Sequence, residues 1–148
     1  MRLEPIDIPQ ADTLSTVRTV VEAVVRMAGA PVKAIAGDIG VHERHVRYRL
    51  AAARALDLLT DSNEVTKKGT RLLATSPGSD AETKEWRRVI TSSRAVQAID
   101  PDLLSRPTVD VKAIADKIVR ISGLSRATAE RRAVVLRAWH RDLGVNDD

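Results

Sequence analysis

Aromatic side chains are almost absent from this chain of 148 residues, which contains Trp86, Trp139 and Tyr48 and no Phe. A core must therefore be built from Leu, Val, Ile and Ala, and such side chains favour helices whose backbones approach closely. Hydrophobic residues make up 43% of the chain and charged residues 30%, a composition typical of a globular protein. We expect both tryptophans in the core or at an interface rather than stacked on nucleic-acid bases.

Apolar periodicity, together with glycine and proline positions, predicts a mainly helical fold. A first helix is expected to start after an N-cap at Asp12 or Thr13 and to end near Ala28, before Gly29 and Pro31. Five more helices are expected over residues 32–39, 42–59, 81–99, 110–121 and 125–142. The remaining predicted elements are an extended segment at 1–11, two short hairpin strands at 58–60 and 64–66, and a helical turn at 71–73. The turn-forming segment 75–80 is the expected linker between two domains, 1–76 and 77–148.

Two segments of the sequence resemble each other, VKAIAGDIG at 32–40 and VKAIADKI at 111–118. The helices that follow align at a constant offset of 83 residues, which pairs Gly40 with Gly123. Each copy predicts a short helix, a glycine turn and a long basic helix, which is the plan of a helix-turn-helix. Chance similarity in a chain rich in Ala, Arg and Val is the alternative.

Two stretches, AIAGDIGVHERHVRYRL (34–50) and LDLLTDSNEVTKKGTRLL (56–73), carry a family resemblance. Over residues 12–75 the chain resembles the winged helix-turn-helix family, in which Leu-Leu-Thr enters a hairpin and Thr-x-x-Gly leaves it for another helix. The resemblance implies a mainly α protein, with a winged helix-turn-helix domain followed by a second, helix-turn-helix-like domain. It also implies that the helix at 42–59 enters the major groove of double-stranded DNA and that the wing at 60–68 contacts the backbone.

A helical wheel separates two faces of the helix expected at 42–59. The inward stripe consists of Val46, Leu50 and Ala53. The outward face consists of Arg44, Tyr48, Ala51 and Ala55, with Arg47 close by. Arginine can bind guanine or phosphate through two hydrogen bonds, so the predicted DNA-binding residues of the first domain are His42, Arg44, His45, Arg47, Tyr48, Asn63, Lys67 and Lys68. The alternative is an ordinary basic helix face exposed to solvent.

The corresponding helix of the second copy presents both basic and apolar side chains outward. Glu130 stands where the first copy has Arg47, and phosphate would repel a carboxylate there. Val134 and Ala138 face the same way, so we favour an interface, either with a second copy of the chain or with the first domain. The alternative is a second DNA-binding element, with contacts from Arg126, Thr128 and Arg131.

Residues 125–143, SRATAERRAVVLRAWHRDL, are similar to C-terminal helical modules of restriction and other phage-defence proteins. The shared pattern is Ser-x-x-Thr-Ala-x-Arg-Arg, followed by Leu and Trp. This resemblance implies a prokaryotic protein of defence or regulation. The nuclease motifs of such systems are not visible in the sequence.

Other classes of function are disfavoured by what the sequence lacks. The chain has no Cys, and His42 and His45 share a helix face without an apparent third metal ligand. No phosphate-binding glycine loop, HExxH or Gly-x-Ser-x-Gly motif appears, so we expect no enzyme activity, metal or cofactor. No apolar run of about 18 residues and no signal-peptide core is present, so we expect no membrane partner and a cytoplasmic location.

A net charge of +4 is only mildly basic, so polyanion binding would depend on local patches. We expect a sequence-specific, homodimeric protein that binds double-stranded DNA, either as a transcriptional regulator or as the DNA-recognition component of a defence system. The alternative is an adaptor that uses winged helices to bind a protein partner in a larger assembly. The dependence of binding on salt separates these two functions.

Overall fold

The computed structural model describes residues 13–144, and the extended segment expected at 1–11 lies outside this range. The prediction of a mainly helical fold is confirmed. The elements are α1 (Leu14–Arg26), α2 (Val32–Ile39), α3 (Glu43–Ala55), α4 (Lys67–Leu73), α5 (Asp80–Ser92), α6 (Arg94–Ile99), the short 3₁₀ helix η2 (Leu103–Ser105), α7 (Val111–Ser122) and α8 (Arg126–Leu143). None of the helices in the described range combines the length and the apolar character that a membrane span needs.

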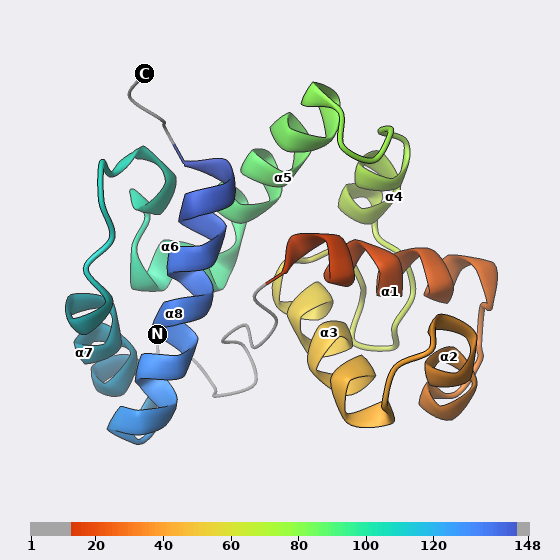
Figure 1. Ribbon diagram of the computed structural model, residues 1–148, viewed down its shortest axis with the longest axis horizontal. Coiled ribbons are helices and arrows are strands. Elements are labelled where there is room, and N and C mark those ends of the chain that lie inside the picture. Colours follow the sequence, from red (N-terminus) through yellow and green to blue (C-terminus); the bar gives the residue numbers. More distant parts are fainter. Residues whose placement is uncertain (1–12, 145–148) are drawn as a thin grey trace.

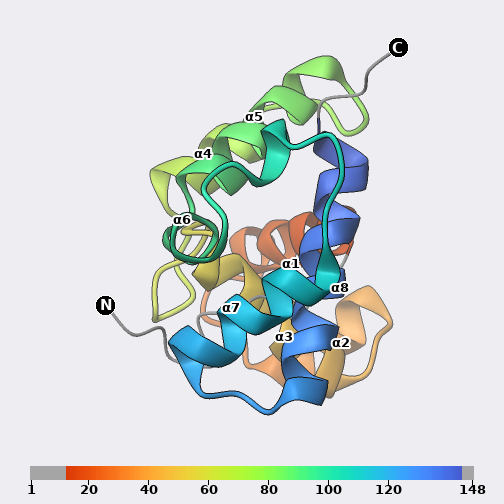
Figure 2. The same cartoon turned by 90° about the vertical axis from the view of Figure 1, so that its left-hand side faces the viewer.

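The helices form two groups that are joined by α4 and α5 (Figure 1). Helices α1 to α3 pack against one another on one side, and α6 to α8 lie on the other. Figure 2, seen from the side of the second group, shows α6 and α7 in front of α1 to α3. The buried apolar residues of both groups belong to one continuous cluster, so the two groups share a core.

The internal repeat corresponds to two helix-turn-helix units, α2–α3 and α7–α8. Gly40 ends α2 with φ 73° and Gly123 ends α7 with φ 75°, a left-handed conformation that glycine adopts without strain. The next helix has a side-chain N-cap in each unit, because His42 accepts a hydrogen bond from Arg44 N and Ser125 accepts one from Thr128 N. Residues 83 positions apart are buried in both copies, namely Val46 and Ala129, Leu50 and Ala133, Ala53 and Leu136, and Leu56 and Trp139.

Helix α3 ends at Ala55, four residues earlier than the sequence predicts. Asp57 has φ 59°, a left-handed conformation that ends the helix. Leu56, Leu58 and Leu59 continue the apolar spacing of a helix but reach the core from an irregular chain. Burial of the three leucines therefore does not require helical backbone.

The predicted hairpin is reduced to a single antiparallel bridge between Leu59 and Val65. No strand is assigned between residues 13 and 144. Lys67 and Lys68, expected on the wing, instead form the first turn of α4. Thr66 explains this early start, because its side chain accepts a hydrogen bond from Gly69 N and caps the helix.

The helix predicted at 81–99 is divided by Ser93 into α5 and α6. Ser93 has φ −63° and ψ 129°, and its fully buried hydroxyl accepts a hydrogen bond from Val96 N. The same hydroxyl donates to Ala55 O at 3.4 Å, which connects the start of α6 to the end of α3. The break between α5 and α6 therefore lies at a point where the two groups of helices contact each other.

Arg18 joins α1 to the beginning of α5 from a buried position. Its guanidinium bonds to the Glu82 carboxylate at 2.5 Å and to the Glu22 carboxylate at 2.8 Å, and it also donates to Thr75 O. Burial alone would lower the pKa of Arg18, but the hydrogen bonds and charges of both carboxylates raise it overall. The predicted linker region is thus held to the first helix by a charged network.

Both tryptophans lie in the core, as the sequence predicts, with Trp86 4% and Trp139 0% exposed. Among the described residues, the Trp139 indole N–H has no hydrogen-bond acceptor. Neither ring is available for stacking on a nucleic-acid base.

Candidate nucleic-acid interface

The start of α3 presents basic side chains to solvent, with the orientation that the helical wheel predicts. Val46, Leu50 and Ala53 are buried against the core, whereas Arg44, His45 and Arg47 are exposed. His42 also is exposed, and its Nδ1 atom accepts a hydrogen bond from Arg44 N at 3.0 Å. That imidazole therefore acts first as a helix cap.

Arg44 and Arg47 differ in their partners. Arg44 Nε donates to the Tyr48 hydroxyl at 3.1 Å, and its guanidinium lies 5.6 Å from the centre of the Tyr48 ring. Arg47 forms an exposed ion pair with Glu43 at 3.2 Å. Within residues 13–144, Arg44 has no carboxylate partner, so its charge is the more available of the two for an anion.

The residues expected at the wing do not form a basic tip. Asn63 Oδ1 accepts a hydrogen bond from Arg54 at 2.7 Å, and Lys68 Nζ lies 3.6 Å from the Asp57 carboxylate and 3.2 Å from the Ser92 hydroxyl. Lys67 is exposed on α4. Of the three predicted wing contacts, only Lys67 presents an exposed side chain.

Helix α8 presents one paired and one unpaired arginine near its start. Arg126 bonds to the carboxylates of Asp116 and Glu130. Hydrogen bonds and charges from those two acids raise the pKa of Arg126. Arg131 instead donates to the Thr128 hydroxyl at 3.1 Å and, as far as the structure is described, forms no ion pair.

The predicted apolar interface on α8 is smaller than the sequence indicates. Val134 is 39% exposed, but Ala138 is only 7% exposed and belongs to the interior of this chain. Ala138 is therefore not accessible to a second copy of the chain. The interface prediction depends on Val134 alone.

The exposed faces of α3 and α8 meet in a cleft of about 660 Å³, here called the α3–α8 cleft. Arg44 and Tyr48 line it from α3, and Thr128, Arg131, Arg132 and Val135 line it from α8. The sequence predicts Arg44 and Arg131 in two separate sites, and the structure brings them together. No carboxylate lines this cleft within the described part of the chain.

Arg132 and Val135 line the cleft but were not predicted as site residues, although the repeat pairs Arg132 with Arg49. Burial lowers the pKa of the Arg132 guanidinium, and the positive charge of Arg131 lowers it further, while Tyr48 acts in the opposite direction. An arginine remains protonated at neutral pH despite such a shift. Arg44 and Arg131, two exposed arginines on a cleft whose described lining contains no carboxylate, favour an anionic ligand.

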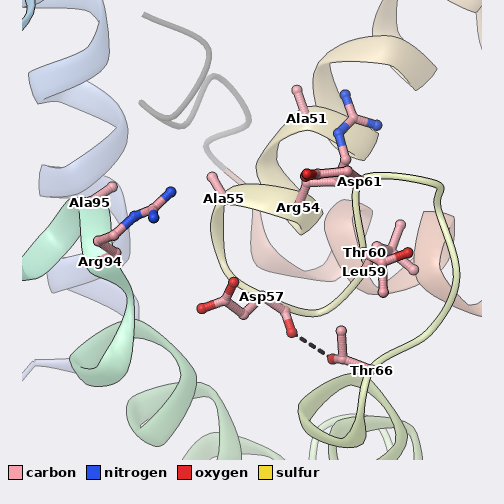
Figure 3. A pocket seen from close by; sticks show the side chains of 10 residues that line it. All are labelled: Ala51, Arg54, Ala55, Asp57, Leu59, Thr60, Asp61, Thr66, Arg94 and Ala95. Carbon is pink, nitrogen blue, oxygen red and sulfur yellow. Dashed lines mark hydrogen bonds between the residues drawn. The ribbon is translucent and has the colours of Figure 1, made fainter. Parts of the chain in front are cut away.

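A second cavity, of about 360 Å³, is lined by the last turn of α3 and the start of α6 (Figure 3). Ala51 and Ala55 line it from α3, and Arg94 and Ala95 lie opposite on α6. The other lining residues include two acids and one base, Asp57, Asp61 and Arg54. Because both acidic and basic side chains line this cavity, it does not favour an anion. The part of the exposed α3 face that favours an anion is therefore the start of the helix.

No family model, curated protein or solved structure matches this chain. Any function must therefore be inferred from the geometry and the charges of the two helix-turn-helix units.

Proposed function

We propose that this protein binds double-stranded DNA through the start of α3. The observation that carries the proposal is Arg44, an exposed arginine without a carboxylate partner in the described structure, on the second helix of a helix-turn-helix unit. The beginning of that helix is where such units contact base edges. His45 and Arg47 are exposed beside it and can contact bases or phosphates.

The segment after α3 supports the proposal as a shortened wing. It leaves α3 at Ala55, turns back through the Leu59–Val65 bridge and enters α4 at Lys67, the order of elements in a winged helix. Asn63 and Lys68 are engaged within the protein, so we assign DNA contact to α3 first. The role that the sequence resemblances support is that of a regulator or a DNA-recognition component of a prokaryotic defence system.

The test is binding to a fluorescent duplex of random sequence, followed by selection of preferred sites. Phosphate contacts make affinity fall steeply with increasing salt. Replacing both Arg44 and Arg47 by Ala is expected to weaken binding by at least about tenfold, since one specific arginine contact contributes about 1–3 kcal/mol. The fold should be retained, because both side chains are exposed.

A matched control removes the same charge elsewhere. Arg71 on α4 and Lys84 on α5 are exposed and far from the start of α3 in sequence, so the double variant R71A/K84A should bind as the wild type does. Equal affinity of the R44A/R47A variant and the wild type would exclude α3 as the DNA-binding helix. Absence of binding even at low salt would favour the protein-binding adaptor.

A further inference from the structure

We propose that the α3–α8 cleft binds one sugar–phosphate backbone of the duplex whose groove α3 contacts. This inference rests on the proposed function and assigns α8 a part in the same DNA complex. Arg44 would contact the strand from one wall of the cleft, and Arg131 from the other. The two helix-turn-helix units thus form one binding site instead of two.

The cleft has room for one sugar–phosphate strand but not for a whole duplex. Its volume of about 660 Å³ is a small fraction of that of a duplex segment long enough to present a major groove. A whole duplex therefore cannot enter between α3 and α8, but one backbone can. Because α3 is a wall of the cleft, a strand held there leaves the start of α3 beside the adjoining groove.

The chemistry of the walls fits a phosphodiester. The Arg44 and Arg131 guanidiniums are held by neutral hydroxyls, those of Tyr48 and Thr128, rather than by carboxylates. Exchange of a neutral hydroxyl for a phosphate oxygen strengthens the hydrogen bond, because the acceptor becomes charged. Both hydroxyls can then donate to phosphate as well.

The charges elsewhere on α8 leave only the cleft wall of this helix suited to contact with a phosphate backbone. Arg126 is already paired with Asp116 and Glu130, and those carboxylates oppose phosphate at the beginning of α8. Arg131, which has no carboxylate partner among the described residues, lines the cleft instead. We therefore infer that α8 holds the backbone and does not read the base sequence.

The decisive experiment compares the salt dependence of duplex binding for the wild type and Arg131→Ala. Loss of one phosphate contact should reduce the slope of log K against log salt by about 0.9 and weaken binding about fivefold at about 0.15 M salt. The factor should be the same for selected and random duplexes, because a phosphate contact carries no sequence information. Arg131→Lys keeps the charge and should retain most of the slope.

Arg137→Ala is the matched control, since Arg137 is exposed on the same helix and does not line the cleft. It should leave the slope unchanged, and all variants should keep the wild-type circular dichroism. If R131A binds as the wild type does while R44A/R47A loses binding, the cleft proposal is wrong and the proposed function stands. If the wild type binds no duplex, the proposed function itself fails.

Binding of a single-stranded oligonucleotide of the selected sequence shows whether the backbone in the cleft belongs to a duplex or to a single strand. The duplex should bind more tightly, because only a duplex offers α3 a groove. Tighter binding of the single strand, with the same loss in R131A, would overturn the assignment to a duplex.

Discussion

Arg18 shows how a single charged residue can fix the relation between distant segments. Its side chain is 7% exposed and contacts residues 57 and 64 positions later in the chain, Thr75 and Glu82. A charge removed from water is tolerated only when its hydrogen bonds are satisfied, and here two carboxylates and a carbonyl oxygen satisfy it. The sequence marks Arg18 only as one arginine within an apolar stretch.

Replacing Arg18 by Met should lower the free energy of unfolding by about 3–5 kcal/mol, because the substitution leaves the half-buried Glu82 without its cation. Urea unfolding followed by circular dichroism measures the change. The control is Arg26→Met, which removes an exposed ion pair with Asp38 and should cost less than about 1 kcal/mol. The double variant R18M/E82L should recover part of the loss, and equal losses in R18M and R26M would refute the structural role of Arg18.

Some of the ion-pair partners of the arginines at the site could be predicted from the spacing of single residues. Glu43 and Arg47, and likewise Arg126 and Glu130, are four residues apart on a helix, a spacing at which opposite charges pair. That spacing alone marks Arg47 and Arg126 as engaged. The pairing of Arg126 with Asp116 joins two helices and depends on how α7 packs on α8.

Among the elements, α4 shows why a Thr-x-x-Gly sequence follows the shortened hairpin. Thr66 caps the helix through Gly69 N and also donates its hydroxyl proton to Asp57 O at 2.5 Å. A Cβ atom at Gly69 would lie 2.4 Å from Leu58 O and 2.8 Å from a methyl carbon of Val65. The absence of a side chain at residue 69 thus lets α4 pack directly on the preceding segment.

Gly69→Ala is therefore expected to destabilise the protein by about 1–3 kcal/mol, the usual cost of overpacking. Gly37→Ala is the matched control, since Gly37 lies inside α2 and a Cβ there meets nothing within 4 Å. That control should stabilise the protein by about 0.5–1 kcal/mol, because alanine has a higher helix propensity than glycine in a helix interior. Thermal unfolding of both variants checks the opposite signs, and a neutral G69A would contradict the close packing of α4.

The elements that the sequence predicts well are those with local stop signals. Helix α2 ends at Gly40 and α7 ends at Gly123, both at the predicted glycine turns, and Ser125 caps α8. The end of α3 and the break at Ser93 were missed, because neither has a glycine or a proline and both depend on tertiary contacts. The hairpin predicted over 58–66 likewise forms only one bridge, because Leu58 and Leu59 pack into the core.

For the whole molecule, the location of the α3–α8 cleft could not be predicted, since it depends on how two helical groups pack through α4 and α5. Arg44 and Arg131 are 87 positions apart, and each repeat by itself indicates only a basic helix. The helical wheel gives the face of α3 correctly but not what lies opposite that face.

The shared core predicts that the two groups of helices unfold together. Trp86 lies on α5 and Trp139 on α8, so neither tryptophan belongs to the group α1 to α3, whereas circular dichroism reports on all helices. Urea unfolding curves from fluorescence and from circular dichroism should therefore coincide, because one buried cluster and the Arg18 network connect both groups. Separate midpoints would show that 1–76 and 77–148 are independent domains.

Homodimer formation through α8 stays a prediction that depends on Val134. Val134→Glu should convert a dimer into a monomer in light scattering, because an apolar contact would have to bury a carboxylate. Val25→Glu is the control, since Val25 is 48% exposed on α1 and should not affect association. A wild-type mass of one chain, or a V134E protein that remains dimeric, contradicts the predicted interface.

The left-handed backbone at Gly40 and Gly123 makes both turns sensitive to chirality. An L-residue is strained at these φ angles, whereas its mirror image, a D-residue, prefers them. A D-alanine in either place restricts the unfolded chain without altering the conformation of the folded turn. Chemical synthesis can thus stiffen the joint before α3 and the joint before α8 one at a time, with every side chain of the cleft left in place.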